Sequence, residues 1–536
     1  MARTFGPAYT SSQMANNVDF AVSRIASVNP ATGEVLGELD TAGPAEVRAA
    51  VFRARTAQPD WNALGVRKRV VVLRRFQQIL LAHKTDVARR ITQEAGKPVI
   101  EALLTEVLVV LDAARFLIDN AFEILREQKL PHGNLAMKSK AGRILHESYG
   151  VIGIISPWNY PFSIPATEGL AALVAGNAVV LKPSELTPLI ALELQKLLRE
   201  AGVPDDVFQV LPGDGATGAA LVGSEIDKLI FTGSVATGRR IAQVAGERLL
   251  SVVLELGGKD PMIVLEDADV DVASSGAVWG AFMNAGQTCL SVERCYVHHR
   301  LYSAFLDACC EKARKLRVGN GMDPGTEIGP MINERQVRVV ESHLEDAQQR
   351  GARVRTGGVR LREFGQTFFA PTVLANVDHS MRIMREETFG PVLPIMPFSD
   401  DAEGVRLAND SNFGLAASVW TNDRAHGERV ARQMQAGTVM VNDAVSCFSI
   451  SEAPHGGVKS SGLGRTHGRW GLEEMARVKY LNSDRIPRMK KIWWFGYGSG
   501  FAGEMDSFLD LLYARSLREK VKAAVNSVGA LWRRKL

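Results

Sequence analysis

The sequence is poor in cysteine and has none of the patterns that cysteines form in disulfide frameworks or zinc sites. Five cysteines occur in 536 residues, and no Cys-x-x-Cys pair is present. An odd and scattered set of thiols argues against both kinds of site and is typical of a reducing compartment. We therefore expect a cytoplasmic protein whose site holds no metal.

Long apolar runs and a strong charge imbalance are also missing. No run reaches the roughly 18–20 apolar residues that span a bilayer, and the first residues lack the apolar segment of a secretory signal. The chain has 63 Lys+Arg against 59 Asp+Glu, a net charge of +4, so no nucleic-acid partner is expected. What is present is a large chain, 46% hydrophobic, with enough residues for two or three lobes of about 100–200 residues each.

Short apolar runs alternate with helical patterns through most of the chain. Six runs have the composition of buried strands: residues 150–156, 178–183, 209–213, 228–233, 261–265 and 438–441. Residues 189–201 and several stretches between 44 and 128 have apolar residues at helical spacing. Strands that alternate with helices predict parallel sheets, so the expected fold class is α/β with doubly wound domains.

Three residues of chemical interest follow turn-rich motifs. Asn159 lies between two prolines after a predicted strand, Glu255 precedes paired glycines, and Cys289 follows Gly286-Gln287-Thr288. Taken singly, each has an ordinary structural explanation, because most free cysteines are buried small apolar residues and Asn or Glu near Pro and Gly is usual in turns. Their order along the chain is much more specific than any one of them.

The order and approximate spacing of six motifs resemble those of the aldehyde dehydrogenase superfamily over about residues 25–485. The motifs are Pro157-Trp158-Asn159-Tyr160-Pro161, Lys182-Pro183-Ser184-Glu185, Phe231-Thr232-Gly233-Ser234, Glu255-Leu256-Gly257-Gly258-Lys259, Gly286-Gln287-Thr288-Cys289 and Glu387-Thr388-Phe389-Gly390-Pro391. The resemblance implies an aldehyde dehydrogenase-like fold with two doubly wound α/β domains and a small β oligomerisation element.

The resemblance also implies how the chain is divided. A dinucleotide-binding domain is expected over residues 25–128 and 150–256, and a catalytic domain over residues 257–456. The oligomerisation element is expected over residues 129–149 and 477–486, and family members assemble through it into homodimers or homotetramers. Residues 487–536 form a further, basic C-terminal tail.

The chemistry that the resemblance implies is oxidation of an aldehyde to a carboxylic acid with NAD(P)+. Cys289 would attack the aldehyde carbon, because a thiolate is a strong nucleophile near neutral pH. The Asn159 side chain and the Cys289 backbone N–H would stabilise the oxyanion of the thiohemiacetal. Glu255 would then activate the water that hydrolyses the thioester.

The resemblance places the cofactor on other motifs, although the Gly-x-Gly-x-x-Gly dinucleotide fingerprint is absent. The loop that ends at Gly238 would open a helix whose N-terminus holds the pyrophosphate. A carboxylate at Glu185 would repel a 2′-phosphate, which favours NAD, with NADP left open because Lys182 is near. The expected cofactor-binding residues are Ser156, Trp158, Lys182, Ser184, Glu185, Gly213, Thr232, Gly233, Ser234, Gly238, Leu256, Glu387 and Phe389.

The sequence leaves the aldehyde undecided. Residues 284–297 and 57–61 resemble a succinate-semialdehyde dehydrogenase subgroup, but no cation for a substrate carboxylate can be assigned, and aliphatic aldehydes fit equally well. Two other functions also stay open at this level: a cysteine hydrolase without redox chemistry, and a non-catalytic membrane scaffold.

The tail differs in composition from the rest of the chain. Residues 485–536 hold eleven Lys/Arg and four Asp/Glu, together with Trp493-Trp494-Phe495. A helical stretch is predicted from about Glu504 to Lys535. One broad apolar face of it is formed by Met505, Phe508, Leu512, Val521, Val525, Val528 and Trp532. Such a tail either docks on a membrane surface, which would make the protein peripheral to the membrane and favour medium- or long-chain aldehydes, or packs on the enzyme or on a sister subunit.

Overall fold

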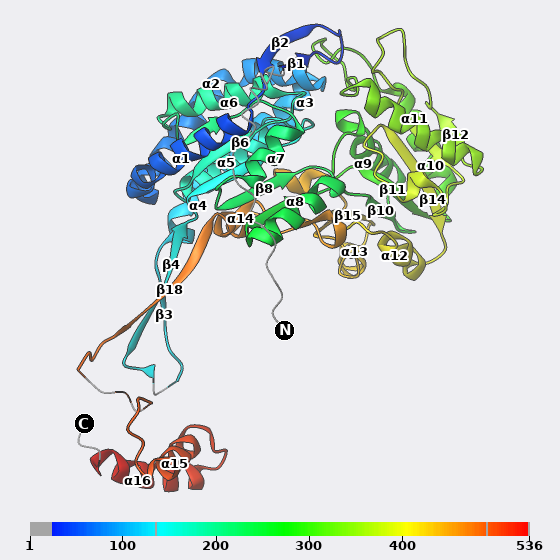
Figure 1. Cartoon of the computed structure of the whole chain (residues 1–536). Coiled ribbons are helices and arrows are strands. Elements are labelled where there is room, and N and C mark those ends of the chain that lie inside the picture. Colours follow the sequence, from blue (N-terminus) through cyan, green and yellow to red (C-terminus); the bar gives the residue numbers. More distant parts are fainter. Residues whose placement is uncertain (1–23, 135–136, 489–490, 492, 534–536) are drawn as a thin grey trace, which may run out of the picture. The chain divides into compact units, whose positions relative to one another are not determined.

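The computed structural model describes residues 24–134, 137–488, 491 and 493–533 (Figure 1). The chain separates into two compact units. The larger unit comprises the chain up to Arg126 and His146–Arg477, and the smaller unit comprises Glu127–Leu145 and the chain from Val478 onward.

The larger unit begins with an antiparallel hairpin and a series of helices. The hairpin joins β1 (Arg24–Val28) to β2 (Val35–Asp40). Four helices and one π-helical turn follow: α1 (Pro44–Ala63), α2 (Gly65–Ala95), α3 (Val99–Ala102), η1 (Leu103–Val107) and α4 (Leu108–Leu125). The helical pattern predicted between residues 44 and 128 is confirmed.

A six-stranded sheet follows, in the order β17-β9-β8-β5-β6-β7. Its strands are β5 (Val151–Ile155), β6 (Ala178–Lys182), β7 (Phe208–Val210), β8 (Lys228–Thr232), β9 (Ser251–Glu255) and β17 (Gly462–Leu463). All neighbours are parallel except β17, which runs antiparallel to β9. The four strands predicted in this region are confirmed.

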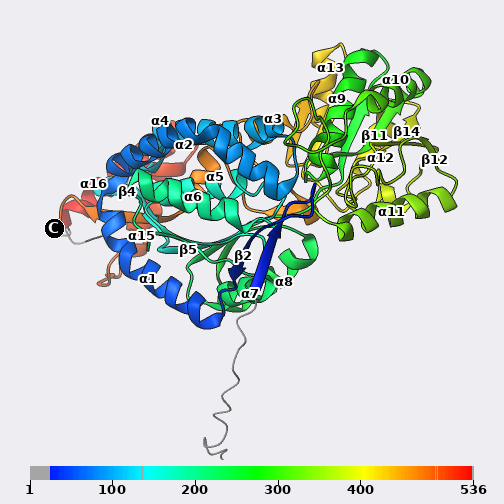
Figure 2. The ribbon, with the colours of Figure 1, turned by 90° about the horizontal axis from the view of Figure 1, so that it is seen from above.

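Helices cover both faces of this sheet. They are α5 (Ser163–Val174), α6 (Pro188–Ala201), α7 (Gly215–Gly223) and α8 (Val235–Arg248). Figure 2 shows α2, α4, α5 and α6 on one face, and α1, α7 and α8 on the other. This is the doubly wound arrangement that the sequence predicts.

A seven-stranded sheet forms the second part of the larger unit, in the order β12-β13-β14-β11-β10-β15-β16. Its strands are β10 (Asp260–Val264), β11 (Val292–His298), β12 (Arg353–Thr356), β13 (Thr372–Ala375), β14 (Val392–Phe398), β15 (Ala416–Trp420) and β16 (Thr438–Val441). Its helices are α9 (Val270–Phe282), α10 (Tyr302–Lys315), α11 (Glu334–Gln349), α12 (Asp401–Asn409) and α13 (Arg424–Ala431). Only β12 is antiparallel to its neighbour.

The two sheets have separate hydrophobic cores. One core gathers the apolar residues of the six-stranded sheet and its helices, and the other those of the seven-stranded sheet. Two cores, each large enough for a domain, are what a chain of this length requires.

The smaller unit contains a three-stranded sheet, in the order β18-β4-β3, and two helices. The strands are β3 (Gln128–Leu130), β4 (Lys140–Ser148) and β18 (Ala476–Asp484). They occupy the segments expected to form the oligomerisation element, whose role in assembly stays a prediction.

The C-terminal helices correct one detail of the sequence analysis. The predicted single helical stretch is two helices, α15 (Phe501–Tyr513) and α16 (Leu517–Arg533), because Ala514 is extended and Ser516 begins a new helix. Met505, Phe508 and Leu512 are half-buried, whereas Val521 and Val525 are exposed. The side chains of Val528 and Trp532 lie outside the described residues. Within the described part of the chain, no helix is long and apolar enough to cross a membrane.

Candidate active site

Two of the three predicted catalytic residues lie at the carboxyl ends of strands of the six-stranded sheet, and the third lies just before a strand of the seven-stranded sheet. Asn159 follows β5, Glu255 is the last residue of β9, and Cys289 lies between α9 and β11. All three line one cleft of about 1430 Å³. The carboxyl ends of parallel strands are where α/β folds usually bind ligands.

The cleft brings together most of the residues that the sequence predicts for the site. Eleven of them line it: Trp158, Asn159, Glu185, Thr232, Gly233, Ser234, Glu255, Leu256, Cys289, Glu387 and Phe389. The rings of Trp158 and Phe389 meet edge to face, with centroids 5.4 Å apart. Residues separated by more than 200 positions therefore share one concave surface.

Five predicted residues do not line this cleft: Ser156, Lys182, Ser184, Gly213 and Gly238. Ser156 precedes Pro157 at the end of β5, and Ser184 immediately precedes Glu185. Lys182 is buried at the end of β6, with its Nζ 3.6 Å from Glu185 Oε2.

Gly213 and Gly238 act through the backbone. A Cβ at Gly213 would lie 2.0 Å from the hydroxyl of Thr217, and one at Gly238 would lie 2.4 Å from a methyl group of Leu256. Both positions require glycine because their neighbours pack too closely for a side chain.

The opposite wall of the cleft was missed by the sequence analysis. It consists of Ile332, Asn333, Arg335, Gln336 and Val339, in and just before α11. The side chain of Gln336 donates to the backbone carbonyls of Thr388 and Phe389, at 3.0 and 3.2 Å. Gly329-Pro330 and the N-cap Asn333 mark the start of a helix here, but neither signal indicates that this helix borders the cleft.

Cys289 also borders a second cavity, of about 450 Å³, on its other side. Besides Cys289, its walls are formed by Thr105, Tyr160, Ile164, Trp279, Met283, Thr288, Leu290, Val445, Ser446, Phe448 and Ser449. A third cavity, of about 1010 Å³, shares Thr105, Trp279 and Met283 with it. We call the second and third cavities together the channel. The thiol therefore lies where the cleft and the channel meet.

The outer part of the channel has an apolar rim. Ile100, Leu104 and Trp279 line it, with exposed fractions of 59%, 54% and 47%. Its one basic residue among the described residues, Lys312, donates to Asp271 Oδ1 and Ser275 Oγ, both at 2.7 Å. Leu104 and Thr105 belong to the π-helical turn η1, a geometry often found at functional sites.

A buried ion pair supports Asn159. Lys97 Nζ donates to the backbone oxygen of Asn159 at 2.7 Å, lies 2.8 Å from Glu106 Oε1, and sits over the ring of Tyr160 at 3.8 Å. The Asn159 side-chain nitrogen donates to the carbonyl of Gln287 at 3.0 Å. These contacts fix the amide beside the loop that carries Cys289.

That loop is held in an unusual backbone conformation. Asn284 and Ala285 both have a φ of 52°, in the left-handed region, and Gly286 has a φ of 72°. A Cβ at Gly286 would lie 2.1 Å from the carbonyl oxygen of Gly390. Non-glycine residues in this region persist only where the surroundings hold them, and they cluster at functional sites.

The electrostatics of the site favour neutral groups. Burial raises the pKa of the Cys289 thiol well above its usual value, and the carboxyls of Asp260, Glu387 and Glu255 raise it further. Burial likewise raises the pKa of Glu255 well above the usual range, and raises that of Glu387 to about 8. At rest the thiol is protonated, so the site needs a base or an added positive charge to activate it.

The residues present in the cleft fit a dinucleotide. Thr232, Gly233 and Ser234 lead from β8 into the 14-residue helix α8, whose first turn offers backbone N–H groups of the kind that bind phosphate. A Cβ at Gly257 would lie 2.5 Å from Glu387 Oε2, so glycine leaves room for that carboxylate beside the cleft. The aromatic pair of Trp158 and Phe389 offers apolar surface near Cys289 for a ring.

Two doubly wound α/β domains, with a large cleft at the carboxyl ends of strands, define a class: dinucleotide-dependent oxidoreductases. The sequence matches the aldehyde dehydrogenase family over residues 18–481. The chain belongs to this family.

Similar proteins support this assignment over nearly their whole length. The 4,4'-diapolycopene aldehyde oxidase of a Methylomonas species is 41% identical over 494 residues, which cover 92% of each chain. The NADP+ succinate-semialdehyde dehydrogenase of Escherichia coli is 39% identical over 458 residues, covering 84% of this chain and 93% of that protein. The NAD+ complex of an aldehyde dehydrogenase from Bacillus cereus superposes with a TM-score of 0.83 at 36% identity, covering 86% of this chain and 93% of that one.

These findings confirm the predicted family, the predicted fold class and the predicted general activity, that of an aldehyde dehydrogenase. The predicted cofactor class, a nicotinamide dinucleotide, is confirmed at the level of the family, because relatives include an NAD+ complex and an NADP+-dependent enzyme. The predicted likeness to succinate-semialdehyde dehydrogenases is confirmed as a likeness. The assigned roles of single residues and the domain boundaries stay predictions.

Proposed function

We propose that this protein oxidises an apolar aldehyde to its carboxylic acid with NAD+, through a thioester on Cys289. The observation that carries the proposal is the position of Cys289 at the junction of the cleft and the channel. A nucleophile in this place meets an aldehyde from one side and a cofactor from the other. A purely hydrolytic site would need no such cleft.

In the proposed reaction, Cys289, Asn159 and Glu255 each have a separate role. The Cys289 sulfur adds to the aldehyde carbon, and the side-chain amide of Asn159 stabilises the resulting oxyanion. Losing one such donor typically costs about 2.7–4 kcal/mol of barrier. A dinucleotide bound in the cleft would supply a positive charge near the thiol and accept a hydride. Glu255 then takes a proton from the water that hydrolyses the thioester, which frees the sulfur and releases the acid.

Glu185 supports a preference for NAD+ over NADP+. Its side chain lines the cleft and is 46% exposed, with Lys182 Nζ 3.6 Å away. A carboxylate here accepts a hydrogen bond from a ribose hydroxyl and repels a 2′-phosphate. Lys182 is buried and its charge faces Glu185, so it offsets only part of that repulsion.

The channel supports an apolar substrate over an ω-carboxylated one. No Lys or Arg is among the residues that line its inner cavity in the described part of the chain. A substrate carboxylate buried there would lack a charged partner, which is costly. The name of the Methylomonas relative, 4,4'-diapolycopene aldehyde oxidase, describes an aldehyde with a hydrocarbon body. Its aligned region is also longer than that of the Escherichia coli relative, 494 residues against 458.

A panel of aldehydes tests the proposed substrate class and the proposed cofactor preference. The full-length protein is assayed by NADH or NADPH absorbance with hexanal, a longer apolar aldehyde and succinate semialdehyde, each with both cofactors. We expect kcat/KM to be highest for the apolar aldehydes with NAD+. A preference for succinate semialdehyde would refute the substrate class, and ester turnover without any aldehyde-dependent NADH would refute the dehydrogenase.

The tail supports a second, separate proposal: contact with an anionic membrane surface. Phe495, Leu517 and Val525 are 97%, 77% and 70% exposed, and α16 begins among basic residues. Apolar side chains beside cations are typical of helices that lie on anionic lipid. We expect the full chain to cosediment with phosphatidylserine vesicles and a chain ending at residue 486 to stay in solution. Equal pelleting of the two proteins would refute membrane contact. A smaller oligomer mass for the shortened chain would also refute it, because the tail would then join subunits of the proposed homodimer or homotetramer.

A further inference from the structure

A second group of titratable side chains lies behind Glu255, and the proposed mechanism does not use it. Glu168 on α5 and His455 are buried, and His467 is half-buried. His455 Nε2 lies 3.7 Å from Glu255 Oε2, and the rings of His455 and His467 are 5.8 Å apart. On the other side, Thr232 pairs with Glu255 across strands β8 and β9 and donates from its hydroxyl to Glu168 Oε1 at 3.3 Å. Two routes therefore lead away from Glu255.

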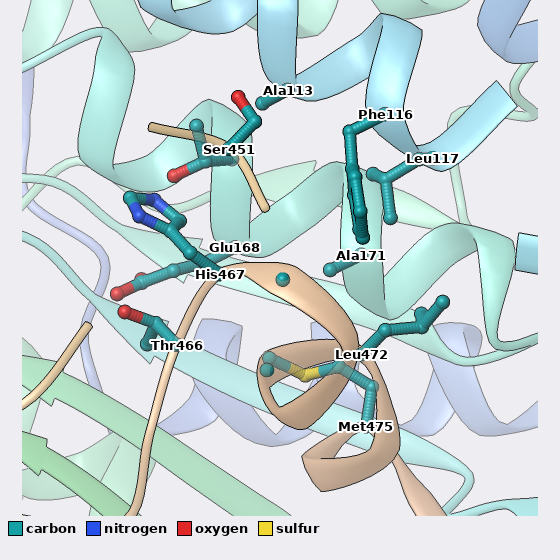
Figure 3. Close-up of a pocket in the computed structure, with 13 residues that line it drawn as sticks. Ala113, Phe116, Leu117, Glu168, Ala171, Ser451, Thr466, His467, Leu472 and Met475 are labelled. Atoms are coloured by element: carbon teal, nitrogen blue, oxygen red, sulfur yellow. The ribbon is translucent and has the colours of Figure 1, made fainter. Parts of the chain in front are cut away.

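Both routes reach the same cavity, which is separate from the cleft and has a volume of about 370 Å³ (Figure 3). Glu168 and His467 both line it, together with Ser451 and Thr466. Figure 3 shows these polar side chains gathered on one side of the cavity, with Phe116 on the other. A cavity with one polar wall is the kind that holds ordered water.

Several polar atoms of Glu255 and of the side chains behind it have no protein partner. Among the described residues, both carboxylate oxygens of Glu255, Oε2 of Glu168, and Nδ1 of His455 and of His467 are buried without a hydrogen bond. Buried polar atoms in folded proteins are nearly always paired, with water where no protein group serves. Two of these atoms belong to Glu255 and three to the side chains around it, so ordered water beside them would complete their hydrogen bonds.

The charges around the group suit proton transfer. Burial raises the pKa of Glu168 to about 8, and the Glu168 carboxyl adds to the effect of burial on the pKa of Glu255. Arg465 opposes this rise, while its guanidinium donates to the backbone carbonyls of Gly457 and Gly464. Burial lowers the pKa of His455 to about 3 and of His467 to about 4, so both imidazoles are neutral near pH 7. Each carboxyl opposes ionisation of the other, so a proton on either one is stabilised.

We propose that Glu168 receives the proton that Glu255 takes up in each hydrolysis step and passes it into the water of this cavity beside His467. The proposal rests on the proposed role of Glu255 as general base. In that step a carbon–oxygen bond to water forms, the carbon–sulfur bond breaks, and one proton moves from the water to Glu255. The same proton then moves by way of the Thr232 hydroxyl and water to Glu168, with no electron transfer. Glu168 touches neither substrate nor cofactor, so it is a positioning residue that acts through Glu255.

The test separates hydrolysis from the earlier steps. Glu168→Gln in the full-length protein is mixed rapidly with NAD+ and hexanal, and the NADH signal is followed from the first turnover. We expect a burst of one NADH per active site at the wild-type rate, followed by a steady state slower by about 10–100-fold, as for loss of proton transfer. The rising limb of the steady-state rate against pH should move to lower pH, because the carboxylate that raises the Glu255 pKa is gone.

Controls distinguish this role from a structural one. Glu168→Asp keeps the carboxyl and should restore most of the steady-state rate, whereas a packing role would be harmed by both changes. An unshifted pH limb with wild-type turnover in Glu168→Gln would overturn the proposal. If Glu168→Gln shows no cooperative thermal unfolding, His467→Gln is used instead. We expect this variant to keep the burst and to have a slower steady state. Wild-type turnover in it would count against the relay. Wild-type protein without any aldehyde-dependent NADH would instead overturn the proposed function itself.

Discussion

The cleft and the channel that meet at Cys289 differ in the chemistry of their walls. Both have hydroxyl groups, but the cleft also has carboxylates and a helix N-terminus, whereas the other walls of the inner channel are mainly aromatic and aliphatic, with no carboxylate or basic residue among those described. A charged, phosphate-bearing molecule gains hydrogen bonds to a helix N-terminus only in the first, and an apolar chain loses water-exposed surface only in the second. The difference explains how one thiol can meet two unlike molecules, because each space favours the binding of only one of them.

The largest expected effect comes from removing the atom that both spaces share. In Cys289→Ala the cleft and the channel should still bind their molecules, but aldehyde-dependent NADH formation should fall by at least about 1000-fold because no covalent intermediate can form. Absorbance at the NADH wavelength measures this. Cys310→Ala, a buried thiol on α10 outside both spaces, is the matched control and should keep its rate. Appreciable turnover by Cys289→Ala would rule out the thioester.

A slightly smaller effect is expected on the cleft side of the thiol. Asn159→Ala removes the proposed donor to the developing oxyanion, so kcat should fall by about 100–1000-fold while KM changes little. Steady-state kinetics with hexanal and NAD+ would show this pattern. A rise in KM with an unchanged kcat would instead assign Asn159 to substrate binding.

A single substitution in the channel wall should shift the substrate preference from apolar toward carboxylated aldehydes. Ser449→Arg places a cation in the channel wall, where a charged hydrogen bond to a substrate carboxylate should raise the kcat/KM for succinate semialdehyde relative to hexanal by about tenfold or more. Ser449→Gln has a similar length and no charge, and it should leave the ratio near that of the wild type. An unchanged ratio in the arginine variant would mean that substrates do not pass this wall.

The smallest effect concerns cofactor choice at the far end of the cleft. Glu185→Gln removes a negative charge that is partly exposed and therefore screened by water. The ratio of kcat/KM for NADP+ to that for NAD+ should rise by about 3–10-fold. A ratio that does not move would show that Glu185 does not meet the ribose.

The sequence was sufficient for most of the cleft but not for the channel. Asn159 follows β5, whose apolar composition predicts it, whereas Glu255 ends β9 and was identified by its motif and the family resemblance. The channel is assembled from single residues such as Thr105, Trp279 and Phe448, which come from three distant segments. Each of these lies in an ordinary apolar pattern, and only the folded chain shows that they face a common space.

Two features were readable in the sequence and were missed. Glu168 is the only charged residue in α5, an otherwise apolar and almost wholly buried helix, and a lone carboxylate in such a place calls for an explanation. Ser516-Leu517-Arg518-Glu519 has the form of a capping box, and the Ser516 hydroxyl accepts from the Glu519 N–H at 3.1 Å. That motif marks the start of a new helix and explains why the tail forms two helices.

The π-helical turn η1 links the shape of the channel to the oxyanion site. Leu104 and Thr105 face the channel, while the next residue, Glu106, accepts from the backbone N–H groups of Phe162 and Ser163 and pairs with Lys97. Deleting one residue of this turn would restore a regular α-helix and remove the bulge that sets the positions of Leu104, Thr105 and Glu106. Any attempt to lengthen or narrow the passage by changing the length of this segment would therefore also withdraw Glu106 from its partners. Engineering for other aldehydes has to proceed by side-chain replacement at this turn and not by insertion or deletion.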